Sequence, residues 1–70
     1  MKEITASMAG TVLNVLVSEG ETITTGQAVL TLESMKMEIP IEAVTEGEVA
    51  SVNVNVGDFV NEGDVLVVMK

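Results

Sequence analysis

The chain of 70 residues matches itself at an offset of 37 residues without a gap. The match pairs residues of the same kind: Ile4 with Ile41, Ala6 with Ala43, Gly10 with Gly47, Val12 with Val49, Val15 with Val52, Val17 with Val54, Gly20 with Gly57, Glu21 with Asp58, Ile23 with Val60 and Gly26 with Gly63. Self-similarity of this kind is typical of folds that pack copies of one supersecondary unit around a shared core. We therefore expect two similar halves related by a pseudo-twofold axis.

Within each copy, apolar and polar residues alternate with a period of two. Val52, Val54 and Val56 alternate with polar residues, which predicts a half-buried strand. Six glycines, many of them next to polar residues, mark tight turns between short strands, and no helical period is sustained. This pattern predicts an all-β fold, a small antiparallel sandwich or flattened barrel. The residues expected to face its core are Val15, Val17, Leu30, Leu32, Ile41, Val52, Val54, Val65 and Val67.

The composition limits what the chain does. A hydrophobic fraction of 47% is enough for one compact core, so we expect residues 1–70 to form a single domain. The sequence has no cysteine and no histidine, which removes thiol nucleophiles, Ser-His triads and the usual zinc ligands. The carboxylates are scattered and none follows the spacing of a calcium loop, so we expect no metal site.

Charge and hydropathy also limit the partners. Three lysines against eleven acidic residues, a net charge of −8, disfavour nucleic acid, and the lone aromatic Phe59 offers no platform for stacked bases. No apolar run is long enough to cross a bilayer, and the first residues, Met1-Lys2-Glu3, do not resemble a signal peptide. We expect a protein of the cytoplasm that binds neither membrane nor nucleic acid.

The segment from Glu33 to Glu38 joins the two copies. Under the offset of 37, residue 33 corresponds to Lys70 and residue 38 to Met1. If Glu33 and Glu38 are neighbours across a hairpin, then Met1 and Lys70 are neighbours at the opposite pole. The repeat therefore predicts a hairpin that stands alone, far from the chain ends.

The tip of this hairpin, Met35-Lys36, is unusual for a turn. Two-residue hairpin loops need positive φ, which Asn-Gly or Asp-Gly adopts most easily. A Met-Lys tip in an otherwise consistent sequence indicates a functional constraint. Lys36 is also the only lysine away from the chain ends, and it lies between Met35 and Met37, whose flexible thioether side chains suit docking surfaces. The alternative interpretation is a solvated lysine on a turn, with Met37 ending the apolar stripe that continues through Ile39 to Ala43.

The stretch Glu33-Ser34-Met35-Lys36-Met37-Glu38, at the centre of a duplication, resembles the biotinyl branch of the biotinyl/lipoyl attachment domain family. The resemblance covers essentially the whole chain. It departs from the family at Ser34, where alanine is more frequent, and at Ala9, where several members have proline before the glycine. The resemblance implies a barrel-sandwich hybrid of two four-stranded antiparallel sheets. It also implies covalent biotin on Lys36, with Met35 and Met37 as flanking recognition residues.

The same resemblance implies a carrier without catalytic activity. Its implied partners are a biotin protein ligase, a biotin carboxylase and a carboxyltransferase. A lipoyl or dual biotin/lipoyl carrier is the nearest alternative, although lipoyl carriers usually have an acidic residue where this chain has Met35. A second alternative is an interaction module that is never modified. Glu33 and Glu38 either orient the domain on basic partner surfaces or are ordinary solvated charges.

Overall fold

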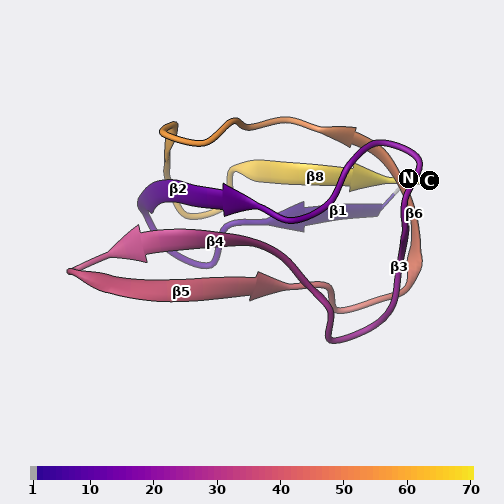
Figure 1. Cartoon of the computed structure of the whole chain (residues 1–70), viewed down its shortest axis with the longest axis horizontal. Coiled ribbons are helices and arrows are strands. Elements are labelled where there is room, and N and C mark those ends of the chain that lie inside the picture. Colours follow the sequence, from indigo (N-terminus) through magenta and orange to yellow (C-terminus); the bar gives the residue numbers. More distant parts are fainter. Residues whose placement is uncertain (1) are drawn as a thin grey trace.

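The computed structural model describes residues 2–70, and in that range the chain forms eight strands and no helix. The strands are β1 (Lys2–Thr5), β2 (Gly10–Val15), β3 (Thr22–Ile23), β4 (Ala28–Ser34), β5 (Met37–Glu42), β6 (Gly47–Val52), β7 (Phe59–Val60) and β8 (Val65–Met69). They form two four-stranded antiparallel sheets, with strand orders β1-β8-β6-β3 and β5-β4-β2-β7. Figure 1 shows the two sheets as the layers of a flattened barrel. The predicted all-β architecture is confirmed.

The two sheets are copies of each other under the offset of 37 residues. Adding or subtracting 37 relates β1 to β5, β8 to β4, β6 to β2 and β3 to β7, so the order β1-β8-β6-β3 becomes β5-β4-β2-β7. The pairing registers agree as well, since Lys2 pairs with Met69 and its equivalent Ile39 pairs with Leu32. The predicted pseudo-twofold relation is therefore present in the strand pairing.

Each half contains a β-bulge that sequence alternation alone did not indicate. The β4–β5 register shifts between Ala28 and Leu30, and the β1–β8 register shifts in the same way around Leu66. A bulge sets two residues against one and turns both toward one face. As a result Val29 and Leu66, which have the wrong parity for the core, are fully buried, whereas Ala28 and Val65 are only half-buried. The sequence-based expectation of a buried Val65 was wrong for this reason.

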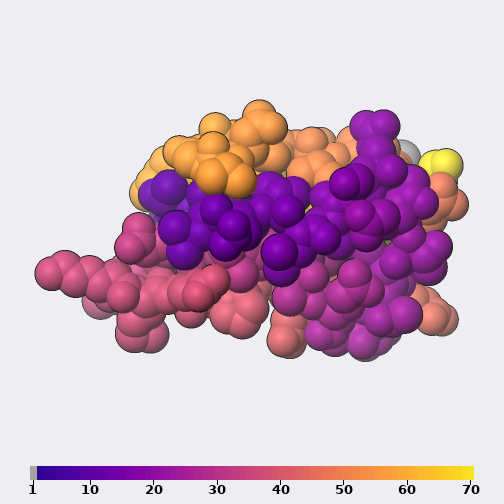
Figure 2. All heavy atoms as spheres, viewed as in Figure 1, coloured from indigo at the N-terminus to yellow at the C-terminus, as the bar shows by residue number. Residues whose placement is uncertain are grey.

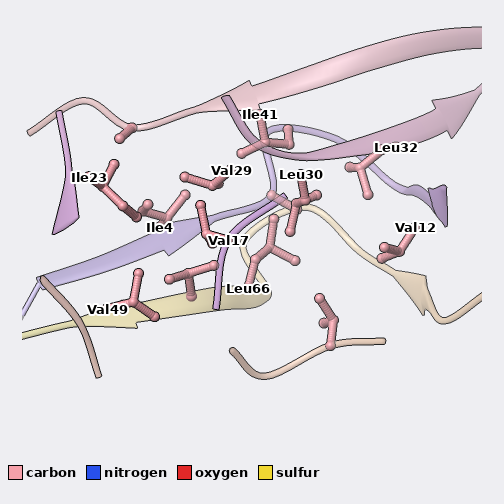
Figure 3. Packing of buried hydrophobic residues seen from close by; sticks show 14 of the residues in the cluster. Ile4, Val12, Val17, Ile23, Val29, Leu30, Leu32, Ile41, Val49 and Leu66 are labelled. Atoms are coloured by element: carbon pink, nitrogen blue, oxygen red, sulfur yellow. The ribbon is translucent and has the colours of Figure 1, made fainter. Parts of the chain in front are cut away.

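The core lies between the two sheets and receives side chains from both (Figure 3). Six of the nine residues expected there are buried: Val17, Leu30, Leu32, Ile41, Val54 and Val67. Val15 and Val52 are half-buried instead, because they end β2 and β6 and line an open groove where the two halves meet. Val56 is 63% exposed, since β6 ends at Val52 and the predicted strand does not continue.

One type of turn occurs four times and closes the loops of both halves. In each turn the backbone N–H of the first residue donates to a side-chain oxygen of the fourth, and the fourth N–H donates to the first carbonyl. The third residue is always a glycine with a φ between 87° and 95°, a region that costs other residues about 1–2 kcal/mol. The turns are 18–21, 24–27, 55–58 and 61–64. Glycine therefore has a specific conformational role in these turns.

Leu32 provides a test of this core. It is fully buried in the central strand β4, whereas Leu16 is largely exposed in the loop after β2. Leu32→Ala is expected to lower the free energy of unfolding by about 2–5 kcal/mol, because it leaves a cavity between the sheets. Leu16→Ala is the matched control and should change it by about 0.5 kcal/mol or less. Urea unfolding of both variants makes the comparison, and equal losses would contradict the placement of Leu32.

Candidate functional site

The β4–β5 hairpin projects from the end of the molecule opposite the chain termini (Figures 1 and 2). Glu33 pairs with Glu38 and Ser34 pairs with Met37, which leaves Met35 and Lys36 as the two residues of the tip. At the other pole Lys2 pairs with Met69, next to Lys70. The expected neighbourhood of Met1 and Lys70 lies outside the described residues, but the predicted isolation of the hairpin from both described ends is confirmed.

The backbone of the tip is strained. Met35 has a φ of 52° and Lys36 a φ of 65°, and among residues 2–70 these are the two non-glycine residues with positive φ. Two consecutive positive φ angles are the mark of a type I′ hairpin turn, which normally selects Asn-Gly or Asp-Gly. For residues other than glycine, this backbone conformation costs about 1–2 kcal/mol each. The expectation from sequence that Met-Lys occupies a costly turn is confirmed.

The side chains at the tip extend into solvent. Met35 is 91% exposed and Met37 is 62% exposed, and Lys36 between them is exposed as well. Met37 therefore does not end the buried stripe that includes Ile41 and Ala43, and the alternative interpretation of this methionine is wrong. In the described part of the chain no carboxylate oxygen lies within 4.0 Å of the Lys36 amine. The amine is accessible to a modifying enzyme from most directions.

Gly10 secures the base of the hairpin, a role that sequence analysis did not single out. A Cβ on Gly10 would lie 2.7 Å from the carbonyl oxygen of Glu33, so only glycine lets β2 lie this close to β4. Its equivalent Gly47 has more room, because the nearest atom to a Cβ there is the terminal carbon of the flexible Met69, at 3.3 Å. The recurrence of glycine in both copies was the available signal, but it did not distinguish the tight position from the looser one.

Among residues 2–70 no group of three or more acidic side chains is arranged to hold a metal ion. The same residues include no helix with the length and hydropathy to cross a membrane.

Comparison with known proteins identifies the family of this chain. The model of a family described as biotin-requiring enzymes, the biotin/lipoyl attachment domains, matches residues 2–69. The chain belongs to this family. The lysine–methionine hairpin at the junction of two half-domains thus lies in a domain of the biotinyl/lipoyl class.

Several curated relatives match over nearly the whole chain. A biotinylated protein TB7.3 homologue from Mycobacterium leprae is 44% identical over 97% of this chain and 96% of its own length. A biotin/lipoyl attachment protein from Bacillus subtilis is 54% identical over 90% of this chain and 86% of its own length. The biotin carboxyl carrier protein of acetyl-CoA carboxylase from Solanum lycopersicum is 40% identical over 96% of both chains.

A solved structure shows the same fold. The urea carboxylase of Kluyveromyces lactis contains a segment that superimposes with a TM-score of 0.92 and 25% sequence identity. The match covers 99% of this chain but only 6% of the larger protein. The fold of this chain therefore also occurs as a small part of a large carboxylase.

The difference between Gly10 and Gly47 leads to a prediction. Gly10→Ala should destabilise the protein more than Gly47→Ala, because the added methyl group meets the Glu33 backbone in one case and a movable side chain in the other. The expected loss for Gly10→Ala is about 1–3 kcal/mol, the usual range for overpacking. Thermal unfolding of both variants measures it, and a larger loss for Gly47→Ala would contradict the close approach at the hairpin base.

Proposed function

We propose that this chain is a biotin carboxyl carrier, with biotin attached to Nζ of Lys36. The observation that carries the proposal is the exposed amine on a strained Met-Lys tip, held at the far pole of a β-fold shared with biotin-requiring proteins. The relatives named as biotinylated or carrier proteins support this function. The carrier would move carboxyl groups between a biotin carboxylase site and a carboxyltransferase site.

Attachment requires little of this chain beyond a presented nucleophile. The amine attacks only as the neutral base, so the modifying ligase must accept a proton from Nζ. The Nζ of Lys36 would then attack the carbonyl carbon of biotinyl-adenylate. The new C–N amide bond forms as the C–O bond to the phosphate breaks and AMP leaves. Loss of the ammonium charge changes the formal net charge of the protein from −8 to −9.

The site fits a covalently tethered group better than a bound one. The tip is exposed and projects from the barrel, and the groove lined by Val15, Val52 and Val54 does not include it. When attached, biotin supplies the nitrogen that accepts and releases the carboxyl group. Lys36 contributes a flexible arm, and the strained turn orients that arm away from the barrel. Tethering of this kind raises the effective concentration at each partner site without tight binding.

The protein contributes no catalysis of its own under this proposal. The absence of histidine and cysteine from the sequence leaves no conventional nucleophile and base to pair. The chemistry is therefore assigned to the partner enzymes, and the domain supplies recognition and delivery.

A lipoyl or dual carrier is the second candidate, because one relative at 54% identity is named a biotin/lipoyl attachment protein. Met35, in the place where lipoyl carriers usually have an acidic residue, favours biotin. The two adducts differ in mass, so the intact mass of protein from its native cell distinguishes them.

Replacing Lys36 by arginine tests the attachment site. Lys36→Arg keeps the positive charge but substitutes a guanidinium that stays protonated and is not nucleophilic. The variant is expected to fold with an unchanged unfolding temperature and to accept no biotin. Lys2→Arg and Lys70→Arg, at the opposite pole, should be modified as fully as wild type. Intact mass after incubation with biotin ligase, biotin and ATP gives the result, and an adduct on Lys36→Arg would refute the assignment.

Replacing Met35 by aspartate tests whether biotin and lipoyl ligases use this residue to distinguish their carriers. Met35→Asp sets an acid before Lys36, and because the side chain is almost fully exposed, its effect on stability should be about 0.5 kcal/mol or less. Biotin transfer should become slower, and lipoylation should rise. Initial rates with a biotin ligase and a lipoyl ligase, followed by intact mass, make the comparison. Unchanged rates with both ligases would show that specificity resides elsewhere on the domain.

A further inference from the structure

A row of four side chains crosses the outer face of the sheet β5-β4-β2-β7 directly below the hairpin tip. Phe59 pairs with Thr11, Thr11 with Glu33, and Glu33 with Glu38. Residues that pair directly in an antiparallel sheet extend their side chains from the same face. The row spans three strand spacings, roughly 14 Å. We call these four residues the hairpin-side row.

Phe59 is the unusual member of this row. It is the only aromatic residue of the chain, and 65% of its surface is exposed. Burial in the core therefore does not explain it. In Figure 2 the orange segment that includes Phe59 and the pink hairpin lie on one face, on either side of the indigo segment that enters β2.

The internal repeat supplies an independent comparison. Subtracting or adding 37 converts Phe59, Thr11 and Glu33 into Thr22, Glu48 and Lys70 of the other sheet. There Thr22 pairs with Glu48, and the Lys70 amine lies 3.4 Å from the Glu48 carboxylate. The same backbone position thus accepts threonine in one half and carries exposed phenylalanine in the other. The fold does not require an aromatic ring at residue 59.

The two rows also differ in charge. Glu33 and Glu38 face each other across β4 and β5, an arrangement of like charges that destabilises a sheet. In the described chain no lysine amine lies within 4.0 Å of either carboxylate. The equivalent row of the other sheet is neutralised within itself by the pair Lys70–Glu48. The hairpin-side row therefore keeps an uncompensated acidic charge beside an exposed aromatic ring.

We propose that the hairpin-side row is the docking surface for the ligase that modifies Lys36, with Phe59 as its apolar anchor. The inference rests on the proposed function. The partner surface presents an apolar pocket for the Phe59 ring and basic side chains opposite Glu33 and Glu38. A second copy of this chain is a poor occupant, because each copy carries a net charge of −8. Glu33 and Glu38 flank the tip in sequence, so an enzyme seated on the row has Lys36 within its reach.

The test replaces the anchor by the residue that the other half uses in its place. Phe59→Thr copies Thr22, and Val44→Thr is the control, since Val44 is 84% exposed and follows β5 at its end away from the hairpin. The rate of biotinylation by a purified biotin protein ligase is measured with the carrier concentration varied. We expect Phe59→Thr to raise the KM for the carrier about tenfold with kcat unchanged, as loss of an anchoring contact does. Val44→Thr should match wild type.

The acidic part of the row has its own readout. For wild type, added salt should raise the KM for the carrier, because it screens attraction between the row and a basic surface. Glu38→Lys should raise KM at low salt and reduce that salt dependence. It also serves as a second test if Phe59→Thr lowers the unfolding temperature. Glu46→Lys, an exposed glutamate between β5 and β6, controls for net charge.

The outcomes separate this inference from the proposed function. If Phe59→Thr is folded and is biotinylated with the KM of wild type, the docking row is overturned while Lys36 remains the attachment site. If Glu38→Lys and Glu46→Lys change KM equally, the effect is net charge alone and the charged part of the proposal is overturned. If wild type itself accepts no biotin, the proposed function fails first.

Discussion

Neither half of this protein can complete a sheet without the other. Each sheet takes two strands from the first copy and two from the second: β1 and β3 with β6 and β8, and β2 and β4 with β5 and β7. A single copy would leave both its strand edges and its apolar faces exposed, which a unit of about 35 residues cannot sustain. Interleaving buries the valines, leucines and isoleucines of both copies in one shared core. The rest of the structure depends on this exchange of strands.

The interleaved frame explains how the hairpin tip tolerates strain. The chain passes from the first copy to the second through β4 and β5, and β4 is held between β2 and β5 by Leu30 and Leu32 in the core. Strained backbone persists only where the surrounding structure determines it firmly. The frame thus fixes Met35 and Lys36 in a turn they would not adopt alone. It also keeps Lys36 at the pole farthest from the described chain ends (Figure 1).

The two copies have similar buried cores but different exposed surfaces. The buried positions agree closely between the copies, as Val29 with Leu66 and Leu30 with Val67 show. The exposed positions diverge, as Leu16 with Asn53 and Thr22 with Phe59 show. Packing constrains the interior of both copies in the same way, whereas the exposed face of each copy is free to specialise. Such differences between symmetry-related positions separate what the fold requires from what recognition requires.

The sequence by itself determined the two-copy architecture, the isolation of the hairpin, and the strained Met35-Lys36 tip, because these follow from local period, repeat and turn chemistry. It also identified most of the core, including Leu30 and Leu32. Only the tertiary structure decided the bulges that bury Val29 and Leu66, since one extra residue in a strand reverses the parity on which sequence alternation relies. The tertiary structure alone also decided that Gly10 lies against the Glu33 carbonyl. It likewise placed Phe59 in line with Thr11, Glu33 and Glu38. These are contacts between strands far apart in the chain, and their register is set by long-range pairing that no local pattern encodes.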